Sequence, residues 1–324
     1  MKKSIEPSGE VEPVDETHVR WRGQKLVYFG GCDYLRLSWH PSIRKTISKA
    51  FENGPVGVAA SRSTTGNNPF YARVESLLAS FFKAPTATLV PSGYLTNLVV
   101  AQALPVTVDR VFIDQQAHPT LFDAARLSRA RVTRFRHRDA VDLRRRLAGV
   151  DQSCVVMTDA VFASSGKLAP LAEYAQVLPR HAIMLVDDCH GAGVLGDRGA
   201  GSLEHWGLGR QQVIQTITFS KAFGVAGGAI LGPARLRRDI LERSGAFTGS
   251  TPLAPALVKG IDASVRLMDR GTLRLRRLRK NVQRLRRGLN LEPDAFPVLV
   301  VDAETRPEMK RLSAALVLNG IHPP

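Results

Sequence analysis

Cysteine is scarce in this sequence: Cys32, Cys154 and Cys189 are the only three, and their spacing fits neither a disulfide framework nor a zinc motif. No stretch approaches the roughly 18 consecutive apolar residues that a membrane-spanning helix needs. Residues 1–16 contain two lysines but no apolar run, so neither a signal peptide nor an anchor is expected there. These absences predict a soluble, cytoplasmic protein with free thiols and no membrane span.

Acidic residues are also in short supply, because 29 aspartates and glutamates stand against 45 lysines and arginines. The net charge of +16 favours an anionic partner, such as a nucleic acid, a membrane surface, a phosphorylated small molecule or an acidic carrier protein. The excess is mostly arginine scattered along helix-like stretches, so a solvated basic surface explains it equally well. The hydrophobic fraction of 44% is ordinary for a globular chain.

Short apolar runs alternate with helical patterns from about residue 85 onward. This alternation predicts a mostly parallel sheet covered by helices on both faces. Such sheets bind ligands at the carboxyl ends of their strands. The expected strands are residues 86–90, 111–113, 132–135, 154–158, 183–187, 213–219 and 225–231.

The two ends of the chain differ from this middle region. Residues 1 to about 25 are polar and acidic and are expected to form a flexible arm. Apolar residues from Leu275 to Leu289 recur at spacings of three and four, which predicts a helix with a leucine face and an arginine face. A strand at 296–301 and a helix near 306–318 should follow, forming a small unit that ends early.

The segment TFSKAFG (218–224) places Lys221 just after an apolar strand and among small residues. Burial at a strand end lowers the pKa of a lysine, and the neutral amine is a nucleophile that can form a Schiff base. From the heptapeptide alone, an ordinary loop lysine at a turn is the simpler interpretation.

The segment VDDCHGAG (186–193) ends an expected strand, so Asp187 should face the crevice, with His190 at the turn. A buried carboxylate opposite a pyridinium nitrogen keeps that nitrogen protonated and makes the ring an electron sink. Aspartate and histidine also bind metals, but no third ligand lies at a useful spacing, so no metal is expected. An N-cap by Asp188 fits either interpretation.

Two further segments could hold a flat, phosphorylated ring. Ser92 and Gly93, in PSGYLTN, present free backbone N–H groups at a helix N-terminus, which suits a phosphate, and Tyr94 adds a polar group. His118 precedes a proline at a helix start, where an imidazole can stack on a ring or simply lie on the surface. No single segment decides the case. Their order, with the phosphate turn first and the lysine last, is what a pyridoxal phosphate enzyme needs.

Taken together, these segments resemble the α-oxoamine synthases, a family of fold-type I pyridoxal phosphate enzymes. The family includes 8-amino-7-oxononanoate synthase, glycine C-acetyltransferase, serine palmitoyltransferase and 5-aminolevulinate synthase. The similarity runs from about Tyr28 to the last residues. Its matching segments are CDYLRLSWHP (32–41), SRSTTGNNPFYARVESLLASFF (61–82), PSGYLTN (91–97), DQQAHPTLFDAA (114–125), DAVFASSGKLAPL (159–171), VDDCHGAGVLGDRGAGS (186–202), TFSKAFG (218–224) and FTGSTPLAP (247–255).

The resemblance implies an α/β fold with a mostly parallel seven-stranded sheet and a small, apparently truncated C-terminal α+β domain. The implied division is an N-terminal segment at 1–40, a cofactor-binding domain at 41–260 and a small domain at 261–324. In the family, a strand whose arginine binds the substrate carboxylate follows the segment that ends here at Pro324. The small domain is therefore expected to be incomplete.

The resemblance also implies a role for each matched residue. Lys221 would hold the cofactor aldehyde and move the substrate Cα proton, while Asp187 would pair with the ring nitrogen. His190 would contact the ring hydroxyl, and His118 would stack over the ring. The phosphate would lie against Ser92, Gly93, Tyr94, Thr218 and Ser220. Ser250 and Thr251 match a segment that reaches the phosphate of a partner subunit, so a homodimer is implied.

The family reaction condenses an amino acid with an acyl thioester and releases carbon dioxide. The acyl donor is a coenzyme A ester or an acyl carrier protein, and both are anionic, as the charge of +16 favours. The segments FASSGKLAPL and IHPP most resemble the 8-amino-7-oxononanoate synthase branch, which uses L-alanine and a pimeloyl thioester. Glycine C-acetyltransferase and long-chain-acyl members are the nearest alternatives.

The sequence departs from the family pattern at Cys32, where asparagine is usual, at Arg36, where glycine is frequent, and at Ala163, where a cofactor-contacting serine is usual. These departures leave open a catalytically impaired subunit that serves as a binding partner, although retention of Lys221 argues against it. A nucleic-acid binder is the third hypothesis, based on the arginine-rich stretches 134–146 and 274–287. No reading motif accompanies these stretches, and the arginines of 274–287 lie opposite a regular leucine face where they can simply be solvated, so no nucleic-acid partner is expected.

Overall fold

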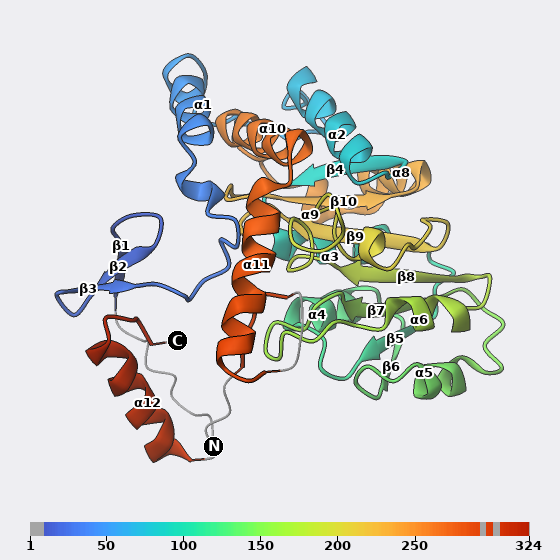
Figure 1. Cartoon of the computed structure of the whole chain (residues 1–324). Coiled ribbons are helices and arrows are strands. Elements are labelled where there is room, and N and C mark those ends of the chain that lie inside the picture. The colour runs from blue at the N-terminus through green and yellow to red at the C-terminus, as the bar shows by residue number, and fades with distance from the viewer. Residues whose placement is uncertain (1–9, 292–295, 301–304, 324) are drawn as a thin grey trace. The chain divides into compact units, whose positions relative to one another are not determined.

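The computed structural model in Figure 1 describes residues 10–291, 296–300 and 305–323. The chain divides into two compact units. The larger unit covers Asp33–Val298, and the smaller combines Met1–Cys32 with Leu299–Pro324. The division expected from the sequence, with boundaries near residues 40 and 260, stays a prediction. Among the described helices, none combines the length and the apolar character that crossing a bilayer requires.

A seven-stranded sheet forms the centre of the larger unit. Strand β10 is antiparallel to both of its neighbours, and all other neighbouring strands are parallel. The mostly parallel seven-stranded sheet expected from the sequence is confirmed. In spatial order its strands are β4 (Thr86–Val90), β10 (Gly228–Gly232), β9 (Val213–Thr218), β8 (Ala182–Asp187), β7 (Cys154–Asp159), β5 (Arg110–Asp114) and β6 (Arg131–Phe135).

Helices cover both faces of this sheet. Successive side chains of a strand point to opposite faces, and on each face they form a hydrophobic cluster with the helices there. Val156 of β7 belongs to the cluster that includes residues of α2, α5, α6 and α10, whereas Val155 and Met157 belong to the cluster with α3, α4, α8 and α9. The helices are α1 (Pro41–Glu52), α2 (Pro69–Phe81), α3 (Gly93–Ala103), α4 (Pro119–Leu127), α5 (Ala140–Leu147), α6 (Leu171–Val177), α7 (Ser202–His205), α8 (Ala234–Arg243), α9 (Gly245–Thr248), α10 (Pro255–Arg270) and α11 (Leu273–Gly288), with a 3₁₀ turn η1 at Leu37–Trp39.

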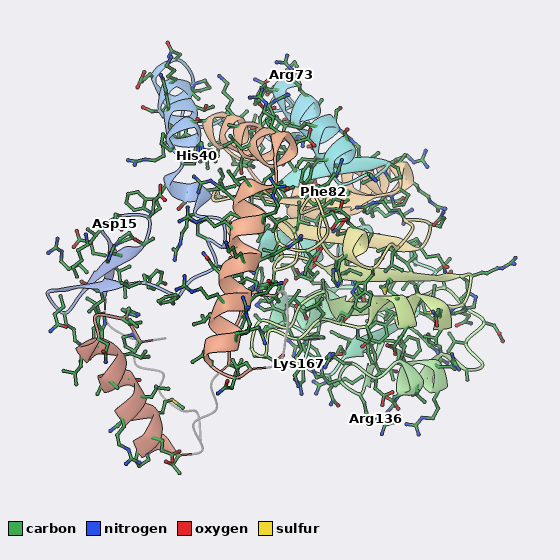
Figure 2. All side chains as sticks on the ribbon, viewed as in Figure 1. Asp15, His40, Arg73, Phe82, Arg136 and Lys167 are labelled. Atoms are coloured by element: carbon green, nitrogen blue, oxygen red, sulfur yellow. The ribbon has the colours of Figure 1, made fainter. Side chains whose placement is uncertain are left out.

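Burial follows the same layering. Figure 2 labels Phe82, which is buried beneath the helices, and Arg73 and Arg136, which project from the outside of the unit. The strands β7, β8 and β9 are almost entirely buried, which explains why β7 and β8 begin as continuous apolar runs in the sequence.

The smaller unit corrects one expectation. Part of the N-terminal region expected to be a flexible arm forms a three-stranded antiparallel sheet, β1 (Val11–Pro13), β2 (His18–Trp21) and β3 (Gln24–Val27). Arg22 and Gly23 both have positive φ, 48° and 78°, as the two-residue turn of a tight hairpin requires. Val19 and Leu26 are paired across β2 and β3, and both are buried.

The C-terminal elements agree with the sequence only in part. Helix α12 (Arg306–Leu318) begins with a capping box between Thr305 and Glu308 and confirms the helix expected there. The strand expected at 296–301 is wrong over 296–300, where no strand forms, and residue 301 lies outside the described residues. An apolar run becomes a strand only where another strand pairs with it. Phe296 is instead fully buried against Tyr34, and the Val298 carbonyl accepts from Arg286.

Candidate active site

A pocket of about 250 Å³ lies at the carboxyl edge of the large sheet. Its walls come from the segments that follow β4, β5, β7, β8 and β9, which run parallel to one another and therefore end at the same edge. All of the site residues predicted from the sequence line it except Ser250 and Thr251. The lining residues are Ser92, Gly93, Tyr94, His118, Thr120, Asp159, Asp187, Cys189, His190, Thr218, Ser220 and Lys221.

Lys221 and His190 form the reactive pair of this pocket. The Nζ atom of Lys221 lies 2.7 Å from Nε2 of His190, and Nδ1 of His190 lies 2.8 Å from the hydroxyl of Tyr34. Burial, followed by the positive charge of Lys221, lowers the pKa of His190 from 6.5 to about 4. The imidazole is therefore neutral at pH 7. A neutral imidazole that accepts at Nε2 from the Lys221 amine presents Nδ1–H to Tyr34.

Asp187 is the last residue of β8 and is only 5% exposed. One carboxylate oxygen accepts from the Asn97 amide at 2.6 Å, and the other accepts from the backbone N–H of Cys189 at 3.1 Å. The Asn97 amide is itself oriented by the Thr216 hydroxyl, which donates to its carbonyl oxygen at 2.7 Å. Within the described residues, Asp187 forms no ion pair with a lysine or arginine, so its negative charge remains available to a cationic group in the pocket.

Asp159 is a second carboxyl group in the pocket. It ends β7 directly opposite Asp187 in the register of the two strands, and it accepts the backbone N–H of His118 at 2.8 Å. Burial and the charge of Asp187 raise the pKa of Asp159 well above 3.8. His118 caps α4, because its Nδ1 accepts the backbone N–H of Thr120 at 3.3 Å. Asp159 thus fixes the backbone from which the His118 ring enters the pocket.

The N-terminus of α3 forms an anion cradle opposite the lysine. Ser92 caps the helix by accepting the Leu95 N–H, which leaves the first backbone N–H groups of α3 available to a ligand. A Cβ atom on Gly93 would lie 2.6 Å from Cβ of Thr218, so only glycine fits at that position. The hydroxyl of Thr218 accepts the Ser220 N–H at 3.2 Å and thereby orders the other side of the cradle.

Some residues that the sequence assigns to the site lie outside the pocket, and some residues of the site were not predicted from the sequence. Thr251 is exposed outside the pocket, and the hydroxyl of Ser250 lies 3.4 Å from the Phe247 carbonyl. Ala163 lies in an exposed turn and does not line the pocket. The pocket adds Thr120, Cys189 and Asp159 to the set. Asp159 carried the same signal as Asp187, a carboxyl at a strand end, whereas Tyr34 is 156 residues from His190 and no local pattern indicates their contact.

The pocket therefore offers a nucleophilic amine, a buried carboxylate with no ion-pair partner among the described residues, a flat imidazole and an anion cradle. No group of three or more histidine, cysteine, aspartate or glutamate side chains in the described part of the chain is arranged to hold a metal ion. All three cysteines are free, and burial raises the pKa of Cys189 well above its ordinary value, so its thiol is neutral.

Comparisons with known proteins place this pocket in context. The aminotransferase class I and II family matches residues 25–317. The 8-amino-7-oxononanoate synthase of Thioalkalivibrio sulfidiphilus is 37% identical over 316 residues, which cover 93% of this chain and 81% of that protein. The enzyme of the same name from Methylococcus capsulatus is 38% identical, covering 86% and 73%. A solved serine palmitoyltransferase from S. paucimobilis, with a bound PLP–myriocin aldimine, superposes with a TM-score of 0.90 at 25% identity, covering 96% and 83%.

Proposed function

Because the chain belongs to the aminotransferase class I and II family, we propose that it is a pyridoxal phosphate-dependent acyltransferase of the 8-amino-7-oxononanoate synthase type. The resemblance to the α-oxoamine synthases is confirmed, since the relatives carry the name of one member and the solved structure that of another. The observation that carries the proposal is the Lys221–His190 pair facing a buried carboxylate and a helix N-terminus in one pocket.

The pocket fits pyridoxal phosphate group by group. An aldehyde matches the amine of Lys221, and a ring nitrogen that needs a counter-charge matches Asp187, which has no ion pair among the described residues. A phosphate matches the α3 N-terminus, where a Cβ on Gly93 would collide with Thr218. When bound, pyridoxal phosphate supplies an electron sink that stabilises negative charge at the Cα atom of the amino acid.

The residues of the chain then have distinct tasks. Lys221 would hold the cofactor through its amine, and the same amine would take the Cα proton of the substrate. His190 accepts a hydrogen bond from Lys221 at 2.7 Å, and because it is neutral it aligns the amine without competing for the proton. Asp187 would keep a proton on the ring nitrogen. His118, which caps α4 and whose backbone N–H is held by Asp159, would lie against the ring.

For the substrates, we infer L-alanine and a pimeloyl thioester, joined with loss of carbon dioxide. The names of the relatives at 37% and 38% identity support this choice. A long-chain-acyl reaction is the second candidate, favoured by the TM-score of 0.90 to serine palmitoyltransferase. We also infer a homodimer, because the Ser250–Thr251 segment, of which Thr251 is exposed, lies outside its own pocket and is available to the site of a second copy.

Amino acid titrations of the holoenzyme test the proposal. We expect L-alanine to change the visible absorbance at lower concentration than glycine or L-serine, and pimeloyl-coenzyme A to release carbon dioxide only in the presence of L-alanine. A preference for serine with a long-chain donor would replace the first candidate by the second. If no amino acid changed the spectrum, the acyltransferase assignment would be wrong.

A further inference from the structure

Helix α11 has an unusual charge composition. Its 16 residues, LRLRRLRKNVQRLRRG, contain eight basic side chains and no acidic one. One face is apolar, and Leu275 and Val282 on that face are buried. The apolar face explains why the helix packs against the rest of the larger unit, but it does not explain why the other faces carry so many arginines.

Three of the arginines attach the helix to its surroundings. Arg274 donates to the Leu35 carbonyl at 3.1 Å, and Arg279 donates to the carbonyls of Val194 and Gly196 at 3.1 and 2.5 Å. Arg286 donates to the Val298 carbonyl at 3.3 Å. At 100° per residue, these three positions flank the leucine face. They have a structural role that needs no further partner.

The remaining five basic side chains form one stripe on the opposite side of α11. At 100° per residue they fall within an arc of about 100° and extend over about 16 Å of helix. All five are exposed, and within the described residues none is recorded in an ion pair with a carboxylate. We call them the α11 stripe: Arg276, Arg277, Lys280, Arg284 and Arg287.

Other arginine-rich helices of the chain compensate their charge internally. Asp142 pairs with Arg145 and Arg146 on α5, and Asp262 pairs with Arg266 on α10. On α11 the like charges stand at spacings of three and four residues, which destabilises a helix. A stripe of like charges without carboxylates on the same helix therefore suits an acidic partner from outside.

The α11 stripe lies on a helix that is bonded to the active-site loop. Arg279 holds the carbonyls of Val194 and Gly196, in the turn that begins just after His190. Tyr34, which is hydrogen-bonded to His190, packs edge to face on Phe296 shortly after α11. A partner bound to the stripe would thus dock on the element that supports one wall of the pocket.

We propose that the α11 stripe is the docking surface for an acidic acyl carrier protein, which delivers the acyl thioester to the pocket. This inference rests on the proposed function and specifies the carrier of its acyl donor. A straight row of five cations matches the acidic helix face of a protein better than the compact phosphates of coenzyme A. The residues 271–291 contain no aromatic side chain for base stacking, which disfavours a single-stranded nucleic acid.

The test compares two matched charge reversals in the holoenzyme. One variant is Lys280→Glu/Arg284→Glu on α11. The control is Lys45→Glu/Lys49→Glu on α1, which has the same i,i+4 spacing, the same charge change and exposed side chains without a recorded ion pair. Binding of pimeloyl-loaded acyl carrier protein is measured by titration, and kcat/KM is measured with that donor and with pimeloyl-coenzyme A.

We expect the α11 variant to weaken carrier binding and lower kcat/KM with the carrier-bound donor on the order of tenfold, with a flatter salt dependence. Its kcat/KM with pimeloyl-coenzyme A and its visible spectrum should match those of the wild type, and the α1 variant should match in every assay. Equal losses in both variants, equal losses with both donors, or no loss would each overturn the proposal. The proposal would also be overturned if the α11 variant lost binding to duplex DNA while its binding to the carrier protein was unchanged.

Failure of the proposed function gives a different result. In that case the wild type turns over neither donor, while the carrier titration still reports whether the α11 stripe binds an acidic protein. Carrier binding that is absent from the wild type would overturn the docking surface even if pimeloyl-coenzyme A is turned over.

Discussion

The substitution Gly93→Ala probes the anion cradle most sharply. The added Cβ would lie 2.6 Å from Cβ and 2.8 Å from Oγ1 of Thr218. Thr218 cannot rotate away cheaply, because its hydroxyl donates to the Gly227 carbonyl at 3.1 Å and accepts the Ser220 N–H at 3.2 Å. The N-terminus of α3 must therefore shift away from β9, by close to an ångström if ordinary contact is to be restored.

A shift of that size should lengthen at least one charge-assisted hydrogen bond to the phosphate, at a cost of about 2 kcal/mol, which corresponds to roughly a thirtyfold higher Kd for pyridoxal phosphate. Overpacking should also lower the free energy of unfolding of the apoprotein by about 1–3 kcal/mol. The assay is a titration of the apoprotein with the cofactor, followed by visible absorbance. The control is Gly245→Ala, where an added Cβ meets nothing within 4 Å. A folded Gly93→Ala protein with wild-type cofactor affinity would refute this account of the cradle.

Three further predictions concern single side chains. The pKa of His190 is about 4 in the folded state and 6.5 in the unfolded state, so the unfolded state binds more protons between these two pH values. The free energy of unfolding should therefore fall by about 3 kcal/mol as the pH drops through this window. Chemical denaturation at a series of pH values should show a smaller fall in the free energy of unfolding for His190→Gln. Asp159→Asn keeps an acceptor for the His118 N–H and should preserve the melting temperature, whereas Asp159→Ala leaves that N–H without its partner and should cost about 1–3 kcal/mol by chemical denaturation; equal effects would contradict the anchoring role. Glu75→Ala removes the carboxylate that pairs with the buried Arg62, so urea titration should show a free energy of unfolding lower by about 3–5 kcal/mol. The control Glu52→Ala, at an exposed position, should lower it by almost nothing.

The sheet and most of the pocket could be predicted because their signals are local. A fully buried strand such as β7 appears as a continuous apolar run, and the polar residues that follow parallel strands meet at one edge. Asp187 ends β8, His190 lies in the turn after it, and Lys221 follows β9. The alternation of strands and helices predicts that such residues meet at one edge, whereas their roles were implied by the family resemblance.

The failures concern features that depend on distant partners. The hairpin around Arg22 and Gly23 was hidden by polar composition, since only Val19 and Leu26 contribute a buried face. The run from Phe296 has strand-like composition but finds no strand to pair with over residues 296–300, and its ring packs on Tyr34 instead. The hydrogen bond between Tyr34 and His190 joins residues 156 positions apart in the sequence, and only the folded chain brings them together.

The central claim is that the Lys221 amine reacts with pyridoxal phosphate, and borohydride reduction tests it most directly. The purified protein is incubated with the cofactor, reduced and digested, and its peptides are mapped by mass. We predict one stable phosphopyridoxyl label on Lys221, absent from Lys221→Ala and unaffected in Lys167→Ala, which removes an exposed lysine outside the pocket. A protein left unlabelled, or labelled equally well in Lys221→Ala, would contradict the claim.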